Sequence, residues 1–71
     1  MQEQSTSFGM RLRQIRKSMG MTQREFAEIL GTSKQVISRY EIGKRIPKVT
    51  IVKEFSLRLG VSIADIIGES E

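Results

Sequence analysis

The segment TQREFAEILGTSKQVISRYEIGKR, residues 22–45, decides the fold of this chain. It begins at Thr22, a residue type that caps helices, and apolar side chains follow at helical spacing. Gly31 then permits the left-handed backbone conformation in which a helix ends and the chain turns sharply. Ser33 is suited to cap a second helix, which we expect over residues 34–41. The segment therefore predicts two short helices joined by a glycine turn.

The second of these helices separates its side chains into an apolar and a polar face. The apolar face carries Val36, Ile37 and Tyr40, and the polar face carries Lys34, Gln35, Ser38 and Arg39. Two short helices, a glycine-containing turn and a cationic face on the second helix are typical of a helix-turn-helix. In that motif the second helix can enter the major groove of DNA.

Ten positions within 26 residues have the identity and spacing of a known motif. They are Thr22, Gln23, Ala27, Gly31, Ser33, Ile37, Ser38, Glu41, Gly43 and Pro47. Through them the chain resembles the XRE/Cro-type, lambda-repressor-like helix-turn-helix family of phage and bacterial regulators, and the similarity extends to both flanks. The resemblance implies a sequence-specific transcriptional regulator, usually a repressor, that binds a palindromic operator in double-stranded DNA as a homodimer.

The composition limits the class of protein to which this chain can belong. Its 71 residues give room for one small domain and for no second independent core. Cysteine and histidine are absent, which removes disulfides, thiolate metal sites and the commonest general base. No apolar run approaches the ~20 residues that cross a bilayer, and the polar start MQEQSTS does not resemble a signal peptide. We therefore expect a cytoplasmic protein with no cofactor, no bound metal, no small-molecule substrate and no membrane association.

Positive charge is concentrated in the front part of the chain. Residues 11–48 contain ten Lys or Arg against three acids, and residues 54–71 contain one Arg against four acids. One basic and one acidic side are expected of a domain that docks on a polyanion such as DNA. A solvated charged surface explains the charge alone equally well.

The flanking segments predict further helices. Residues 8–19 carry an apolar stripe at helical spacing, formed by Phe8, Leu12, Ile15 and Met19. Residues 48–59 carry a second stripe, formed by Val49, Val52, Phe55 and Leu59. Ser62 is suited to cap a last short helix.

Together these segments predict an all-α fold, a compact bundle of four to five short helices that contains the helix-turn-helix. We expect the domain to span residues 8–68. Residues 1–7 form a disordered N-terminal tail in this prediction, and residues 69–71 form a C-terminal tail.

Four residues of the second helix of the motif are candidates for contact with base edges: Lys34, Gln35, Ser38 and Arg39. A glutamine can bond adenine bidentately, and arginine or lysine favours guanine. The resemblance implies base contacts at these positions and adds Ser38 as a supporting contact. Each side chain alone could instead bind only phosphate or water.

Five residues are candidates for contact with DNA phosphates: Arg16, Gln23, Ser33, Lys44 and Arg45. Lys44 and Arg45 follow a glycine turn in a loop that we expect to run along the DNA backbone. For the other three the contact is implied by the resemblance, which also implies that Gln23 braces a glutamine of the second helix. Ser33 is in addition the expected helix cap.

The resemblance implies that Arg16 and Glu41 form a structural pair close to a DNA phosphate. A pair that only holds the first helix against the third is at least as good an account of these two residues. Ile42 departs from the family, which often has a polar residue such as asparagine at this position. A contact made by the backbone amide could survive this change, whereas a contact made by the polar side chain could not.

Apolar residues near the C-terminus serve the core for the most part, but one group is a candidate dimer patch. It consists of Leu57 with Ile51, Ile63 and Ile67. The same patch supports an alternative function, a protein-interaction module such as an antitoxin-like partner, with DNA binding secondary. An enzyme is not expected, because no motif positions a carboxylate pair, a nucleophile with its base or a phosphate-binding glycine loop.

Overall fold

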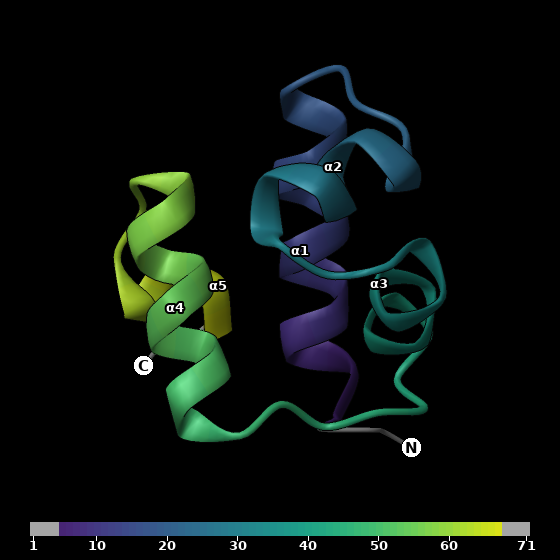
Figure 1. The fold of residues 1–71 in the computed structure, drawn as a ribbon. Coiled ribbons are helices and arrows are strands. Elements are labelled where there is room, and N and C mark those ends of the chain that lie inside the picture. The colour runs from purple at the N-terminus through teal and green to yellow at the C-terminus, as the bar shows by residue number, and fades with distance from the viewer. Residues whose placement is uncertain (1–4, 68–71) are drawn as a thin grey trace.

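The computed structural model describes the backbone of residues 5–67 and the side chains of residues 8–67. These residues form five helices and no strand, as the all-α prediction requires (Figure 1). The helices are α1 (Ser5–Ser18), α2 (Gln23–Leu30), α3 (Lys34–Glu41), α4 (Val49–Leu59) and α5 (Ile63–Ile67). None of the described helices is long and apolar enough to cross a membrane.

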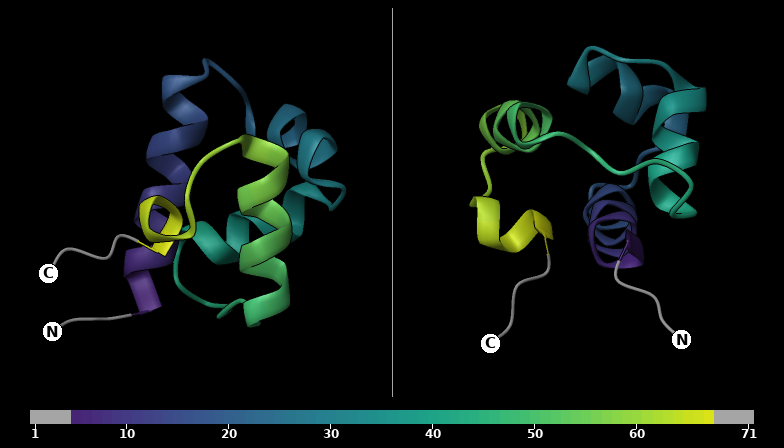
Figure 2. Two further views of the ribbon diagram at one scale, coloured as in Figure 1. Left: turned by 90° about the vertical axis from the view of Figure 1, so that its left-hand side faces the viewer. Right: turned by 90° about the horizontal axis from the view of Figure 1, so that it is seen from below.

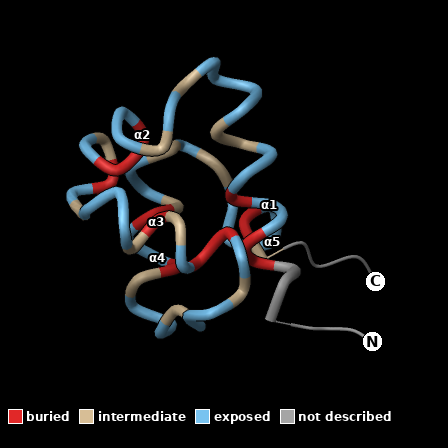
Figure 3. Tube along the Cα trace, turned by 90° about the vertical axis from the view of Figure 1, so that its right-hand side faces the viewer, coloured by how far each residue is buried: buried red, intermediate tan, exposed pale blue. Residues whose placement is uncertain are grey.

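The helix α1 lies between α3 and α5 and contacts both (Figure 2). The helix α2 packs against α3 and α4, and α4 packs against α5. Each of the helices α2, α3 and α4 therefore buries one face and leaves another to solvent. Buried stretches, red in Figure 3, occur on all five helices.

The boundaries of the motif follow from contacts between near neighbours in sequence. The Thr22 hydroxyl accepts from the backbone N–H of Glu25, whose carboxylate accepts from the Thr22 N–H in return. This capping box satisfies two N–H groups that a helix start leaves unpaired. Gly31 adopts the left-handed conformation at φ 72°, and Ser33 caps α3 by accepting from the N–H of Val36.

The first helix begins earlier than its apolar stripe predicts. Ser5 is already helical, so the prediction of a disordered tail over residues 1–7 is wrong for residues 5–7. Residues 1–4 and the predicted tail 69–71 lie outside the described residues. The apolar stripe cannot mark this start, because the first turn of α1 is polar.

An aromatic cluster in the core joins three helices. Phe8 of α1, Tyr40 of α3 and Phe55 of α4 are buried, with ring centroids 5.3 to 6.4 Å apart. Two of the three ring pairs meet edge to face, an arrangement that the charge distribution of aromatic rings favours. The cluster fixes the C-terminal half of α3 against the rest of the domain.

Two residues of the predicted apolar stripes are exposed instead. Met19 lies beyond the last helical residue of α1, so helical spacing no longer directs its side chain inward. Val49 is the first residue of α4 and is 70% exposed, because it lies about a quarter turn from the buried line through Val52 and Phe55. Both errors fall at helix ends.

Gly9 allows α1 to approach the end of α3 closely. A Cβ atom on this glycine would lie 2.2 Å from the backbone oxygen of Tyr40 and 3.0 Å from that of Glu41. Real Cβ atoms do not occupy such positions, so any larger residue would separate the two helices. Helical spacing in the sequence does not predict this close approach.

Candidate nucleic-acid interface

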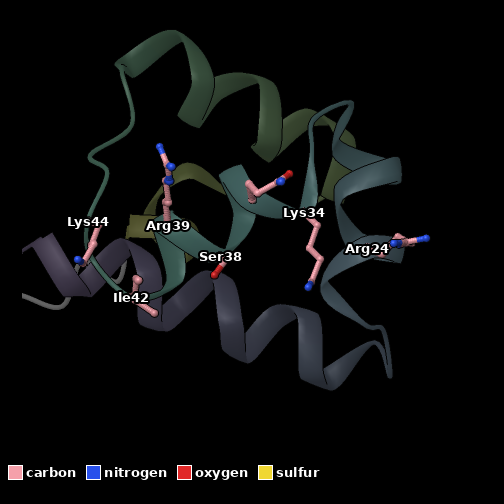
Figure 4. A pocket seen from close by; sticks show the side chains of 7 residues that line it. Arg24, Lys34, Ser38, Arg39, Ile42 and Lys44 are labelled. Carbon is pink, nitrogen blue, oxygen red and sulfur yellow. The ribbon is translucent and has the colours of Figure 1, made fainter.

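One open depression on the surface is lined almost entirely by polar and cationic side chains. We call it the basic concavity; its volume is about 760 Å³. Its lining residues are Arg24, Lys34, Gln35, Ser38, Arg39, Ile42 and Lys44 (Figure 4). All four candidate base-contacting residues of α3 are therefore brought together on one surface.

The fold orients the polar face of α3 outward by burying the opposite face. Ile37 and Tyr40 are buried in the core, and Val36 packs partly against it. On the other side Lys34, Gln35 and Arg39 are exposed. An eight-residue helix anchored in this way presents its polar side chains on a fixed backbone.

Cations from two other segments extend the concavity. Arg24 comes from α2 and Lys44 from the loop after α3, and Figure 4 shows them at opposite ends of the surface with α3 between them. Gly43, at φ 79°, lets the chain turn directly before Lys44. The arrangement surrounds a polar helix face with positive charge, which favours a polyanionic ligand.

One buried carboxylate connects three helices. Glu41 of α3 accepts from Arg16 of α1 at 2.8 Å (Nε) and 3.1 Å (Nη2), and from Gln23 of α2 at 3.0 Å. A further N–H of Arg16 donates to the carbonyl of Met21 at 3.0 Å. The side chains of Arg16 and Glu41 are only 12% and 3% exposed.

The hydrogen bonds from Arg16 to Glu41 raise the pKa of the Arg16 guanidinium, burial opposes this rise, and the charge of the carboxylate adds to it. The Arg16 guanidinium is protonated with or without this rise, and its hydrogen bonds to Glu41 join α1 to α3. The network leaves little of this side chain for a phosphate, so its geometry favours the structural account of the pair.

Gln23 takes part in the network around Glu41, because its side-chain amide donates to that carboxylate. Its phosphate contact and its bond to a glutamine of α3 stay predictions. An amide has a second N–H, which remains able to donate to a phosphate. Ser33 likewise uses its oxygen as the helix cap and retains its O–H as a donor.

The neighbouring loop residues Lys44 and Arg45 contact different parts of the domain. Lys44 lines the basic concavity, whereas the Arg45 guanidinium lies 5.7 Å from the centre of the Tyr40 ring. Arg45 instead borders a separate cavity of about 300 Å³ beside α4. Its predicted phosphate contact stays a prediction, with a cation–π contact competing for the same group.

The predicted dimer patch is only partly exposed. Leu57 is 82% exposed and Ile63 41% exposed, whereas Ile51 and Ile67 pack partly against the core. Within residues 8–67, no group of three or more His, Cys, Asp or Glu side chains could hold a metal ion.

Sequence reasoning missed Arg24 and did not anticipate that Ile42 would share the concavity. A basic residue in the first turn of α2, directly after Gln23, was the available signal for Arg24. Ile42 follows Ser38 by four residues and so falls on the same helix face. An apolar residue was not expected on that polar surface.

Comparisons with known proteins agree with this geometry. The sequence model of the HTH_3 family, described as "Helix-turn-helix", matches residues 12–66. The SPbeta prophage-derived uncharacterized HTH-type transcriptional regulator YonR of Bacillus subtilis (strain 168) is 42% identical over 55 residues, which are 78% of this chain and 51% of that protein. Antitoxin PezA of Streptococcus pneumoniae serotype 4 is 35% identical over 63 residues, which are 89% of this chain and 40% of that protein.

This chain thus spans about half the length of these two relatives or less. Among solved structures, the clp gene regulator ClgR of C. glutamicum superimposes with a TM-score of 0.81 at 28% identity. The superposition covers 94% of this chain and 87% of ClgR.

Proposed function

The chain belongs to the HTH_3 helix-turn-helix family, and from that premise we propose that it is a sequence-specific DNA-binding transcriptional regulator. The observation that carries this proposal is the basic concavity. It combines an exposed polar helix face with cations from two flanking segments, and no other described feature of the chain has this chemistry.

In this proposal α3 lies in the major groove. Lys34, Gln35 and Arg39 contact base edges, with Gln35 suited to adenine and Arg39 to guanine. Ser38 is half-buried between them and supports these contacts. The three exposed side chains have both the reach and the donors that such contacts need.

Phosphate contacts then position α3 and supply most of the affinity. Arg24 and Lys44 lie on either side of α3, which suits the two DNA backbones that border a major groove. Gln23 and Ser33 retain donors for a phosphate at the N-terminal ends of α2 and α3. Arg45 would join them only by leaving the Tyr40 ring, near which its guanidinium lies in this structure.

We further propose that the chain binds a palindromic operator as a homodimer and represses by covering a promoter, as the resembled family usually does. Two copies would set their recognition helices in successive major grooves, about 34 Å apart. The exposed Leu57 and Ile63, with the partly exposed Ile51 and Ile67, form the proposed contact between the copies.

A second candidate function is supported by the similarity to Antitoxin PezA. In this alternative the exposed apolar side chains of α4 and α5 bind another protein, and DNA binding is secondary. The match covers only 40% of that antitoxin, so it supports a shared domain more directly than a shared partner.

The experiment that tests the proposal is selection of bound duplexes from a random DNA library at near-physiological salt, followed by sequencing. Enrichment of an inverted repeat with half-sites one helical turn apart would support both the regulator and the dimer. A single enriched half-site would support sequence recognition and contradict the dimer. Salt-sensitive binding without any enriched sequence would contradict the regulator and favour the interaction module.

A further inference from the structure

One apolar side chain lies within the otherwise polar basic concavity. Ile42 follows the last helical residue of α3 and is 59% exposed. The six other lining residues all carry hydrogen-bond donors. Ile42 is four residues from Ser38 and seven from Gln35, so all three side chains leave α3 in a similar direction. Figure 4 shows Ile42 between Ser38 and Lys44.

Single exposed apolar residues are common and need no explanation by themselves. The position of Ile42 is what carries the inference, because it occupies the surface that the proposed function places against DNA. Its side chain has no donor or acceptor and cannot hold a phosphate or a polar base edge. The only apolar group that normal bases present in the major groove is the C5-methyl group of thymine.

We propose that Ile42 contacts the C5-methyl group of one thymine in each half-site and so adds a preference for thymine at that position. This inference rests on the proposed function, and it adds a specificity residue to the polar ones. At a rise of about 1.5 Å per residue, Ile42 lies about 10 Å from Gln35 along the helix. The contacted thymine therefore lies within about three base pairs of the pair that Gln35 contacts.

Uracil tests this contact directly, because it pairs as thymine does and lacks only the methyl group. In the selected operator, each thymine of one half-site is replaced by uracil in turn, and the dissociation constant is measured at fixed salt. We expect one position at which the replacement weakens wild-type binding about fourfold. That factor corresponds to burying about one CH₂ group, or about 0.8 kcal/mol.

The variant Ile42→Ala should bind the thymine operator more weakly by a similar factor and lose its dependence on that methyl group. Ile46→Ala is the matched control, because Ile46 is also an exposed isoleucine but does not line the concavity. It should keep the full methyl dependence. Both side chains are exposed, so both variants should fold, which far-UV circular dichroism checks.

A second measurement uses the methyl group of another base. In the selected operator the contacted pair is changed so that cytosine replaces thymine. Methylation of that cytosine at C5 should strengthen binding by the wild-type protein and have no effect on binding by Ile42→Ala. Equal affinities for thymine and uracil operators, or the same methyl dependence in Ile42→Ala, would overturn the inference and leave the proposed function standing. Absence of any selected operator would overturn both.

Discussion

At the scale of single residues, the buried carboxylate of Glu41 should contribute strongly to the free energy of unfolding. Removing it in Glu41→Ala leaves the guanidinium of Arg16 poorly solvated and without its main partner, which should destabilise the domain by about 3 kcal/mol. The double variant Arg16→Met, Glu41→Leu removes both charges and should lose less stability than Glu41→Ala. Urea unfolding followed by circular dichroism measures both. A double variant that loses as much stability as Glu41→Ala, or more, would mean that the pair is effectively solvated.

Loss of the Arg39 side chain should alter the sequence preference of the domain. Arg39→Ala should weaken operator binding by about 1 to 3 kcal/mol and relax the preference at one position, because a bidentate base contact is lost. Lys53→Ala removes an equal charge from the exposed side of α4 and should leave the preference intact. Equal losses on operator and random DNA would assign Arg39 to a phosphate.

Lys44 and Arg45 are neighbours in sequence but should contribute differently to the salt dependence of DNA binding. Lys44→Ala should weaken all duplexes alike and reduce the slope of log affinity against log salt by about one unit, because one phosphate contact is lost. Arg45→Ala should change the slope less, because its guanidinium lies over Tyr40. Affinities at several salt concentrations provide the comparison. Equal changes in slope would show that Arg45 leaves Tyr40 for the DNA.

At the scale of helices, the contact between α1 and α3 depends on Gly9. Replacing a helical glycine by alanine usually stabilises a helix by about 1 kcal/mol. Here the added Cβ would collide with the backbone oxygen of Tyr40, so Gly9→Ala should destabilise the domain, by about 1 to 3 kcal/mol. Thermal unfolding measures this change. Met10→Ala, at an exposed neighbouring position, is the control, and a stabilising Gly9→Ala would contradict the close approach.

The helices of the motif are predictable from sequence because their signals act locally. Thr22 and Ser33 each bond a backbone N–H three residues away, and Gly31 needs no distant partner for its conformation. Contacts between helices lack such signals. Nothing in the sequence around Gly9 indicates that the end of α3 lies against it.

The same distinction separates the predictable from the unpredictable part of the site. The polar face of α3 follows from helical spacing alone. The surface that it shares with Arg24 depends on how α2 crosses α3, which helical spacing does not fix. The separation of Lys44 from Arg45 depends on the Tyr40 ring, a tertiary contact that the charge pattern of the loop does not contain.

At the scale of the whole molecule, assembly is the property that links the basic concavity to a two-fold operator. A single small domain offers few base contacts, so in the proposed function two copies must bind together to reach useful specificity. In that proposal DNA occupies the basic concavity, so the contact between the two copies must lie on another surface. Among the exposed apolar side chains of the described residues, Leu57 of α4 and Ile63 of α5 belong to the predicted dimer patch.

Leu57→Glu tests this assembly, because the side chain is exposed and its replacement should leave the fold intact. An acidic side chain at an apolar contact between identical copies adds two like charges there and should dissociate the dimer. Sedimentation equilibrium without DNA should then detect a monomer, and full-operator affinity should fall toward that of an isolated half-site. Met10→Glu adds the same charge on α1 and should leave the assembly unchanged. A dimer that survives Leu57→Glu would move the contact to another surface.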